Sequence, residues 1–357
     1  RVLTSRRPSR NKEPVGYTAN RSEILGYNVE RYLKECLDSL LCQTYPNIMI
    51  FAVDDGSTDG SGEILDEYGR KDRRLVVQHK KNGGVSSARN RALDAIDECQ
   101  CKFDFICFVD GDDVVSPDFV LQYVELITGY SADYVVCGWQ PFDKKGDFPL
   151  VRETHPICVT DRKGSYQHFF GEGRWGRGGF VSSSLFLSNR CLSLKTVKGL
   201  RFDESFRKGE DQDYLLRALL RVEKGVLSSG VSYRYRIRKS SLSHENLPPV
   251  EDLCLYVSLL KNVEKFPFDV QLAIERRARD LWWLVLNQTV NANLLDRYSK
   301  HLQDAYKVFV SVRPVAPISF SFRRRLFCYS LGDWFLRLYF KRKPEVVCSS
   351  ELKDAFD

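Results

Sequence analysis

The chain has 357 residues, 43% of them hydrophobic and 28% charged, and carries a formal net charge of +7. This length and apolar content allow one large buried core or two smaller ones, which excludes a disordered protein. Residues 1–22 form a polar, basic leader. No run of about 18 apolar residues follows, which argues against a secretory signal and membrane-spanning helices. We therefore expect a cytoplasmic protein.

Neither the cysteines nor the charge identifies a function alone. A chain of this length needs no disulfides, and Cys99 and Cys101 lack the two-residue gap of most zinc sites, so we interpret the cysteines as reduced core residues. Positive charge suits nucleic acid, an anionic lipid or a phosphorylated substrate. Many basic residues lie near the two ends, in residues 1–12 and 323–343.

Helices and strands alternate through the first part of the chain. Apolar periodicity predicts, in order, a helix over 28–41, a strand over 48–53, a helix over 57–68, a strand over 75–79, a helix over 85–96 and a strand over 103–109. This order is typical of an α/β fold with a mostly parallel sheet between helices. Ligands of such sheets lie beyond the carboxyl ends of the strands.

The later part of the chain is less regular. Its pattern predicts a helix over 118–128, a strand over 134–139, a long substrate-side loop over 143–179, a helix over 211–222 and a strand over 231–237. From Pro249 onward the pattern is helical.

One acidic turn follows the strand over 103–109 and consists of Asp110, Gly111, Asp112 and Asp113. Carboxylates two residues apart, around a glycine that permits a tight bend, suit a hard cation such as Mg²⁺ or Mn²⁺ that also binds phosphate oxygens. The alternative for such a turn is an aspartate that caps the next helix.

A second acidic pair, Asp54 and Asp55, follows the strand over 48–53, so both clusters should face one crevice. Carboxylates directly after a buried strand are costly without a partner, and a uracil N3–H or a ribose hydroxyl would be such a partner. Alternatively, Ser57 or Asp59 with Glu63 caps the next helix.

Several blocks occur together in a fixed order. They are Tyr27–Glu30 (YNVE), Gln43–Pro46 (QTYP), Val53–Asp59 (VDDGSTD), Asn82–Asn90 (NGGVSSARN), Asp110–Asp113 (DGDD), Phe202–Phe206 (FDESF) and Gly209–Asp211 (GED). In this order and spacing the chain resembles family 2 glycosyltransferases of the bacterial cell-surface polysaccharide type. The resemblance implies a GT-A fold, a nucleotide-diphospho-sugar donor, here a UDP-sugar, and inversion at the anomeric carbon.

The resemblance also implies roles for single residues. Tyr27, Asn28, Asp54, Asp55, Arg89 and Asp110 would bind the nucleotide-sugar. Asp112, with Asp110, would hold Mn²⁺ or Mg²⁺. Asp211 would be the catalytic base, with Glu210 beside it. Carboxylates in the first turn of a helix stay ionised in the field of its dipole, which suits a base, although an acidic first turn is also common in helices without a catalytic role.

Two further segments are candidate binding sites. Arg234, Arg236 and Arg238 alternate along a strand and could clamp a diphosphate, as Arg236 and Arg238 would in the family, or form a solvated basic face. Trp175 could stack on an acceptor sugar or pack in the protein. The basic, aromatic segment 323–343 could dock on an anionic membrane carrying a lipid-linked glycan acceptor, or pack on the core.

The first strand departs from the family pattern. Family members begin with an apolar strand that ends in Pro, whereas Thr18–Gly26 is polar except at Ile24 and Leu25 and has Gly26 in the place of Pro. We expect either a very short strand or a weakened donor site. The rival to an enzyme is therefore an impaired, glycosyltransferase-like binding protein.

Two other rivals are weaker. A nucleotidyltransferase would add a Gly-rich phosphate loop, which residues 1–26 lack. The basic residues surround no recognition motif, so nucleic acid is not an expected partner. We expect a hexosyltransferase-type enzyme with a catalytic domain over 23–245, divided into a nucleotide-binding half (23–125) and an acceptor-binding half (126–245). A helical region over 246–357 follows, with peripheral membrane association as one expectation. The oligomeric state is not predicted.

Overall fold

The computed structural model describes residues 20–99, 103–142, 157–170, 187–206, 208–238, 248–292, 294–315, 317 and 319–330. The chain divides into two compact units, Arg1–Ser241 and Leu242–Asp357. The domain boundary predicted from the sequence lies at residues 245–246, and the assignment of two functional halves to the first domain stays a prediction.

The first unit is built on one sheet. Its strands are β1 (Asn20–Gly26), β2 (Ile48–Asp54), β3 (Leu75–His79), β4 (Phe105–Asp110), β5 (Val114–Val115), β6 (Tyr134–Phe142), β7 (Ile157–Asp161), β8 (Arg190–Ser193) and β9 (Lys224–Arg236). Within the described residues the strand order is β3-β2-β1-β4-β8-β6-β9-β5, with β7 on β9. The four strands from β3 to β4 are parallel, and the other half is mixed. The α/β fold class is confirmed.

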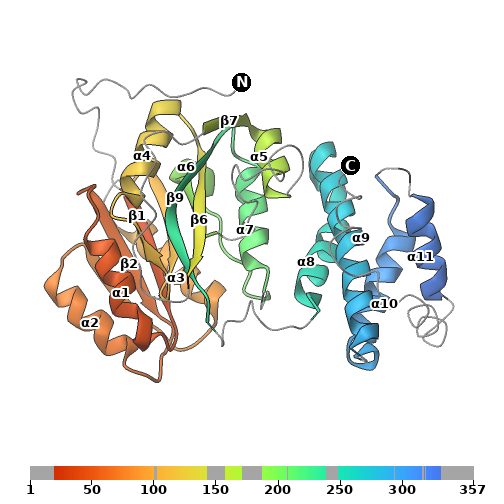
Figure 1. The fold of residues 1–357 in the computed structure, drawn as a ribbon, viewed down its shortest axis with the longest axis horizontal. Helices are drawn as coiled ribbons and strands as arrows, with labels where there is room; N and C mark the ends of the chain where they lie inside the picture. The colour runs from red at the N-terminus through yellow and green to blue at the C-terminus, as the bar shows by residue number, and fades with distance from the viewer. Residues whose placement is uncertain are drawn as a thin grey trace. The chain divides into compact units, whose positions relative to one another are not determined.

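Helices cover both faces of this sheet (Figure 1). They are α1 (Glu30–Leu41), α2 (Ser61–Lys71), α3 (Val85–Glu98), α4 (Phe119–Tyr130), α5 (Arg162–Phe169), α6 (Leu194–Val197) and α7 (Glu210–Leu219). Alternate β4 residues face opposite sides. Cys107 and Val109 share a buried cluster with α1, α2 and α4. Phe108 packs at 5.9 Å against Tyr214 of α7. The next residue on the Phe108 side is Asp110.

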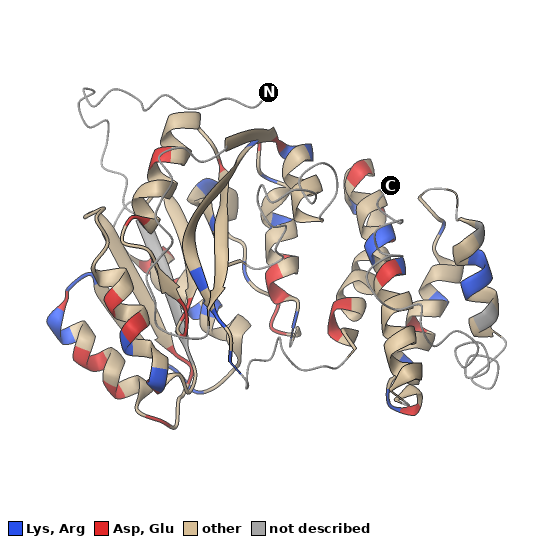
Figure 2. Ribbon diagram, viewed as in Figure 1, with Lys and Arg blue, Asp and Glu red and all other residues tan. Residues whose placement is uncertain are grey.

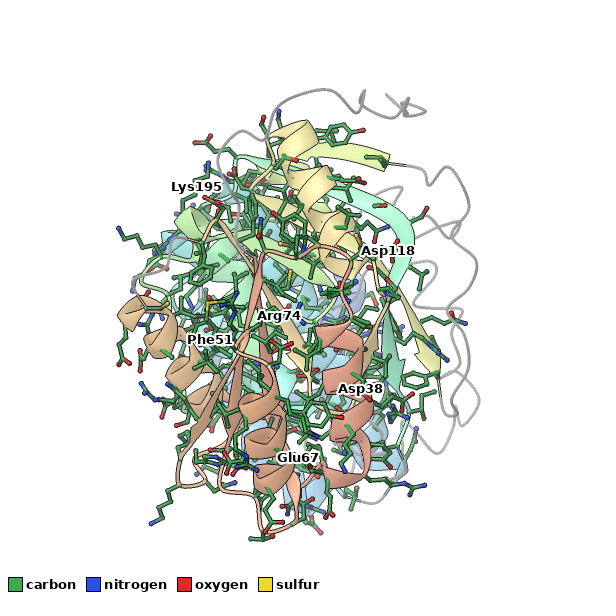
Figure 3. All side chains as sticks on the ribbon, turned by 90° about the vertical axis from the view of Figure 1, so that its left-hand side faces the viewer. Asp38, Phe51, Glu67, Arg74, Asp118 and Lys195 are labelled. Atoms are coloured by element: carbon green, nitrogen blue, oxygen red, sulfur yellow. The ribbon has the colours of Figure 1, made fainter. Side chains whose placement is uncertain are left out.

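The exposed sides of α1 and α2 carry interleaved acidic and basic residues, whereas the strands are mostly uncharged (Figure 2). Figure 3 looks onto this face and labels Asp38 on α1 and Glu67 on α2. Tyr68 donates its hydroxyl hydrogen to Asp38 at 2.8 Å, which joins the two helices. Part of the surface charge on this face therefore takes part in the packing of α1 on α2.

The first strand is longer than its sequence suggested. β1 pairs with β2 along Asn20–Gly26 on one side and with β4 along Asn20–Leu25 on the other, so the expectation of a very short strand was wrong. Main-chain hydrogen bonds to two neighbours stabilise a central strand even where the local residues are poor strand formers. The sheet therefore contains this strand between β2 and β4.

The QTYP block has a structural role. Gln43 follows α1, and its amide donates to the carbonyls of Ser39 at 2.9 Å and Ser116 at 2.7 Å. Its side-chain oxygen accepts the N–H of Val120 in α4 at 2.9 Å. This buried amide therefore fastens the end of α1 to the segment that follows the acidic turn Asp110–Asp113.

Part of the predicted loop over 143–179 is regular. β7 and α5 lie within it, so the loop prediction was wrong for residues 157–169. Both elements are short, and four of the five residues of β7 are half-buried or exposed, so neither produces a sustained apolar period.

The second unit is helical, as predicted. It contains α8 (Val250–Leu260), the 3₁₀ helix η3 (Val263–Lys265), α9 (Phe268–Asn291), α10 (Leu295–Ser311) and α11 (Phe320–Ser330). Trp282 is fully buried and meets Phe309 and Phe322 edge-on at 5.9 Å. Among the described residues, no helix is both long and apolar enough to cross a membrane. The predicted membrane-docking segment 323–343 starts in α11, and residues 331–343 lie outside the described residues.

Candidate active site

Both acidic turns lie at the carboxyl edge of the parallel strands. In the sheet register, Gly26 at the end of β1 is opposite Asp54, and Leu25 is opposite Asp110. The end of β1 therefore lies between the two clusters, as the rule for parallel sheets predicted.

Asp54 is buried and held from two sides. Its carboxylate accepts the N–H of Ser57 at 2.9 Å and lies 3.0 Å from Nδ1 of His79. Burial opposes ionisation, but the bonds from Ser57 and His79 outweigh it and lower the pKa of the Asp54 carboxyl. Asp54 is therefore an anion that orders the turn after β2.

Asp55 anchors the glycine-rich loop before α3. Its carboxylate accepts bonds from Nζ of Lys80 at 2.6 Å and from the N–H groups of Gly83 at 3.0 Å and Gly84 at 2.8 Å. Gly56 has a φ of 73°, and a Cβ there would lie 2.7 Å from the backbone nitrogen of Asn82. The two loops thus touch, and only glycine fits at their contact. The sequence did not single out Lys80, although it follows the strand β3 directly.

The YNVE block borders the same turn. The side-chain oxygen of Asn28 accepts the N–H of Thr58 at 2.9 Å, and the backbone N–H of Asn28 donates to the Ser57 hydroxyl at 3.1 Å. Tyr27 is 51% exposed, so its ring is available to a ligand. Both residues therefore lie beside Asp54 and Asp55.

Asp113, the last residue of the acidic turn Asp110–Asp113, has a structural role. It is fully buried, accepts the Tyr233 hydroxyl at 2.5 Å and the N–H of Arg236 at 2.7 Å. The Tyr233 oxygen in turn accepts the N–H of Asp110 at 3.3 Å. Burial and the charges of Asp112 and Asp110 raise the pKa of the Asp113 carboxyl well above its usual value. Asp113 therefore fastens β9 to the turn and does not cap a helix.

Removing the Tyr233 hydroxyl tests this fastening. Tyr233→Phe is expected to lower the free energy of unfolding by about 1–3 kcal/mol, because a buried acceptor loses its partner. Urea denaturation measures the loss, with Tyr130→Phe on the half-buried end of α4 as the control. An unchanged midpoint for Tyr233→Phe would contradict the role given to Asp113.

The three arginines of β9 and its end do not form a solvated face, because Arg234 and Arg236 are buried. Arg236 donates to the carbonyl of Asp112 at 2.6 Å and to Glu35 at 2.7 Å. Arg238 pairs with the Asp112 carboxylate at 2.6 Å. The alternative of a solvated strand was therefore wrong, and the diphosphate role of Arg236 and Arg238 stays a prediction.

Arg89 joins the acidic turn Asp110–Asp113 to α7. This side chain is 3% exposed, bonds Asp211, and lies 3.0 Å from Glu210 and 3.5 Å from Asp110. Asp110 also accepts the Ser188 hydroxyl at 3.0 Å. Strand alternation on β4 points Asp110 to this side, and Gly209, with a φ of 86°, starts α7 so that both acidic residues lie in its first turn.

The Glu210 carboxyl has a pKa of about 7. Burial and the charge of Asp211 raise this pKa, although Arg89 lowers it. The folded protein therefore holds this proton more tightly than the unfolded chain does. Its contribution to stability is present below the ordinary glutamate pKa and is lost as the pH rises through about 7.

Glu210→Gln should remove that pH dependence. At pH 8 the variant is expected to be more stable than the parent by about 1–3 kcal/mol, with the difference vanishing or reversing near pH 4. Thermal unfolding from pH 4 to 9 measures it, with the exposed Glu223→Gln as the control. A difference that does not vary with pH would contradict the assigned pKa.

The donor set fits a cation that shares its ligands with a substrate. Desolvation raises the pKa values of Asp110 and Asp112, and the charge of Asp211 adds to the rise at Asp110, as that of Asp110 does at Asp112. A cation at the turn would relieve this destabilisation of the two carboxylates. Within the described ranges, no three His, Cys, Asp or Glu side chains form a metal cluster. Mg²⁺ and Mn²⁺ commonly use one or two carboxylates and complete their shell with phosphate oxygens and water, which these two residues would allow.

Two features near this turn lay beyond the sequence analysis. A small cavity beside Asp110 is lined by Trp139, Ser188, Asn189, Tyr233 and Tyr235. Ser188 was not singled out from the sequence, because it belongs to none of the motif blocks. The predicted acceptor residue Trp175 lies outside the described residues.

Comparisons with known proteins bear on the family. The family model "Glycosyl transferase family 2" matches residues 24–186. Glycosyltransferase GlyG of Streptococcus pneumoniae is 32% identical over 60% of this chain and 70% of its own length. Glycosyltransferase GlyA of that organism is 31% identical over 70% of this chain, which spans only 36% of GlyA.

A solved structure shares the fold. The crystal structure of Staphylococcus aureus TarS 1–349 in complex with UDP-GlcNAc has a TM-score of 0.60 at 18% identity, covering 83% of this chain and 82% of TarS 1–349. At this identity the match bears on the fold alone. With the relatives above, it confirms the resemblance read from the motifs: the chain belongs to family 2 of the glycosyltransferases.

Proposed function

We propose that the protein is an inverting hexosyltransferase that moves a sugar from a nucleotide-diphospho-sugar, a UDP-sugar, to a glycan or lipid-linked glycan of a surface polysaccharide. The observation that carries this proposal is the convergence of Asp110, Glu210 and Asp211 on Arg89, at the sheet edge that also holds Asp54 and Asp55. The complex of the similarly folded TarS with UDP-GlcNAc supports the choice of a UDP-sugar.

The nucleoside would lie over the end of β1. Tyr27 offers an exposed ring, and Asn28, Asp54 and Asp55 line the adjoining loops with fixed polar groups. Each of these carboxylates already accepts protein hydrogen bonds, so a base or ribose would bind to a preorganised surface. Preorganisation of this kind lowers the entropic cost of binding.

Asp110 and Asp112 would hold Mn²⁺ or Mg²⁺, which would neutralise charge on the departing diphosphate. Arg238 now neutralises Asp112, so this arginine is near enough to the turn to contact a diphosphate there. Arg236 is already bonded to the Asp112 carbonyl and Glu35, and it would act by holding the turn.

Asp211 would take the proton of the acceptor hydroxyl. The acceptor oxygen then attacks the anomeric carbon, the bond from that carbon to the diphosphate oxygen breaks, and the nucleoside diphosphate leaves. One displacement inverts the anomeric configuration. A positioned carboxylate contributes about 10²–10⁴-fold to such a step.

The alternative of an impaired binding protein rested on the polar first strand, with Gly26 in the place of Pro. β1 nevertheless pairs with β2 over Asn20–Gly26 and with β4 over Asn20–Leu25, which supports the enzyme over this alternative. The test is a panel of UDP-, GDP- and dTDP-sugars with Mn²⁺, in which release of nucleoside diphosphate is measured. We expect release from at least one UDP-sugar and its loss in EDTA. No release and no thermal stabilisation by any nucleotide would overturn the proposal.

A further inference from the structure

Arg89 is buried among carboxylates that come from two distant parts of the chain. One guanidinium nitrogen bonds Asp211 and lies 3.0 Å from Glu210, and the other lies 3.5 Å from Asp110. The resemblance to the family suggested a nucleotide contact for this residue. In the structure, however, these two nitrogens face the candidate base and its neighbours.

An aromatic stack fixes the guanidinium from behind. The Arg89 group lies 5.2 Å from the centre of the Phe202 ring, and Phe202 stacks on Tyr214 at 4.0 Å with an angle of 4° between the rings. Such contacts between a guanidinium and an aromatic face restrict where the charge can move. Tyr214 belongs to α7, the helix that carries Asp211.

The neighbouring residue locks this stack to α3. The Asn90 side chain accepts the N–H of Phe202 at 2.7 Å and donates to the Phe202 carbonyl at 3.0 Å. The NGGVSSARN and FDESF blocks, about 110 residues apart, thus form one support for Arg89. Its position is set by the protein without a ligand.

We propose that Arg89 is a positioning residue that orients the Asp211 carboxylate for proton transfer, and that it is not a donor-binding residue. Arg89 holds Oδ1 of Asp211, while Oδ2 accepts the N–H of Leu187 at 3.3 Å. Oδ2, with the longer bond, is the oxygen that takes the proton. This inference rests on the proposed function, because it gives Asp211 the role of base.

Two variants separate positioning from donor binding. Arg89→Lys keeps the charge but cannot span several carboxylates with a planar fork, so kcat should fall by about 10–100-fold. Arg89→Gln should approach the loss of Asp211→Asn, about 10²–10⁴-fold. In both variants, the donor KM and the Kd of UDP with Mn²⁺ should stay within about twofold of those of the parent. The reason is that a positioning residue does not contact the donor, so the binding common to the ground state and the transition state is unaffected. Arg91→Gln, on the same helix and paired with Glu98, is the matched control.

The double variant gives the sharpest result. A residue that acts through Asp211 has nothing left to position in Asp211→Asn, so adding Arg89→Gln should cost less than about threefold more. The inference would be overturned if the losses of kcat in the two single variants multiplied in the double variant. It would also be overturned, and a nucleotide contact restored, if the Kd of UDP weakened tenfold or more in Arg89→Gln or Arg89→Lys. A parent protein that turns over no donor would overturn the proposed function and this inference with it. An active parent with fully active Arg89 variants would overturn the inference alone.

Discussion

Asp211→Asn is expected to lower kcat for sugar transfer by about 10²–10⁴-fold, the usual contribution of a positioned general base. The amide has nearly the same shape, and its one oxygen can still accept a hydrogen bond from Arg89, but it cannot accept the acceptor's proton. Binding of the donor should be unchanged, because the nucleoside and metal carboxylates lie on other loops. Steady-state kinetics and titration with UDP and Mn²⁺ measure the two quantities separately.

The control is Asp304→Asn, which makes the same chemical change at an exposed position on α10 and should keep full activity. Normal turnover by Asp211→Asn would refute its assignment as base. The base would then be sought in Glu210, whose pKa of about 7 also suits proton transfer.

Asp112→Ala is expected to remove the metal-dependent part of donor binding. Loss of a direct ligand should exceed the 10–100-fold that outer-shell partners contribute, so the Kd of UDP with Mn²⁺ should weaken by at least about 100-fold. In EDTA the variant should bind UDP as well as the parent or slightly better. Arg238, now paired with Asp112 at 2.6 Å, becomes free to meet the diphosphate, and a repelling carboxylate is gone.

The contrast between weaker binding with Mn²⁺ and undiminished binding in EDTA distinguishes a lost metal ligand from general unfolding, because unfolding would weaken binding in both conditions. Asp118→Ala, at the start of α4 and labelled in Figure 3, is the control because Asp118 accepts a bond from Ser116 and lies outside the acidic turn. Metal-dependent binding that survives Asp112→Ala would exclude this residue as the ligand.

Local patterns were sufficient for the elements with strong apolar periods. β3 has the predicted bounds, 75–79, and the bounds of β2 and α3 agree with the prediction within two residues. In each segment, the apolar residues that pack inward form a pattern that is visible in the sequence. β1 differs because a central strand with β2 and β4 on either side draws its stability from main-chain pairing. β7 and α5 were missed because they are short and partly exposed.

The site was predictable in part. The rule that parallel strands end at one edge brought Asp54, Asp55 and Asp110 together without a structure. It could not show that α7 approaches the same edge, since the contact between residues 110 and 211 runs through Arg89, which is distant from Asp211 in the sequence. Nor could it separate Asp113, which fastens β9, from Asp112 beside it. Both are acidic residues of one turn, and only burial and partners distinguish them.

The most direct test of the account is a calorimetric titration of the intact protein with UDP, with Mn²⁺ and in EDTA. We predict saturable binding in both conditions, at least about 100-fold tighter with Mn²⁺, since the metal would join the diphosphate to the carboxylates of Asp110 and Asp112. No binding in either condition, or equal affinity with and without the metal, would contradict a metal-dependent nucleotide-sugar site at the acidic turn.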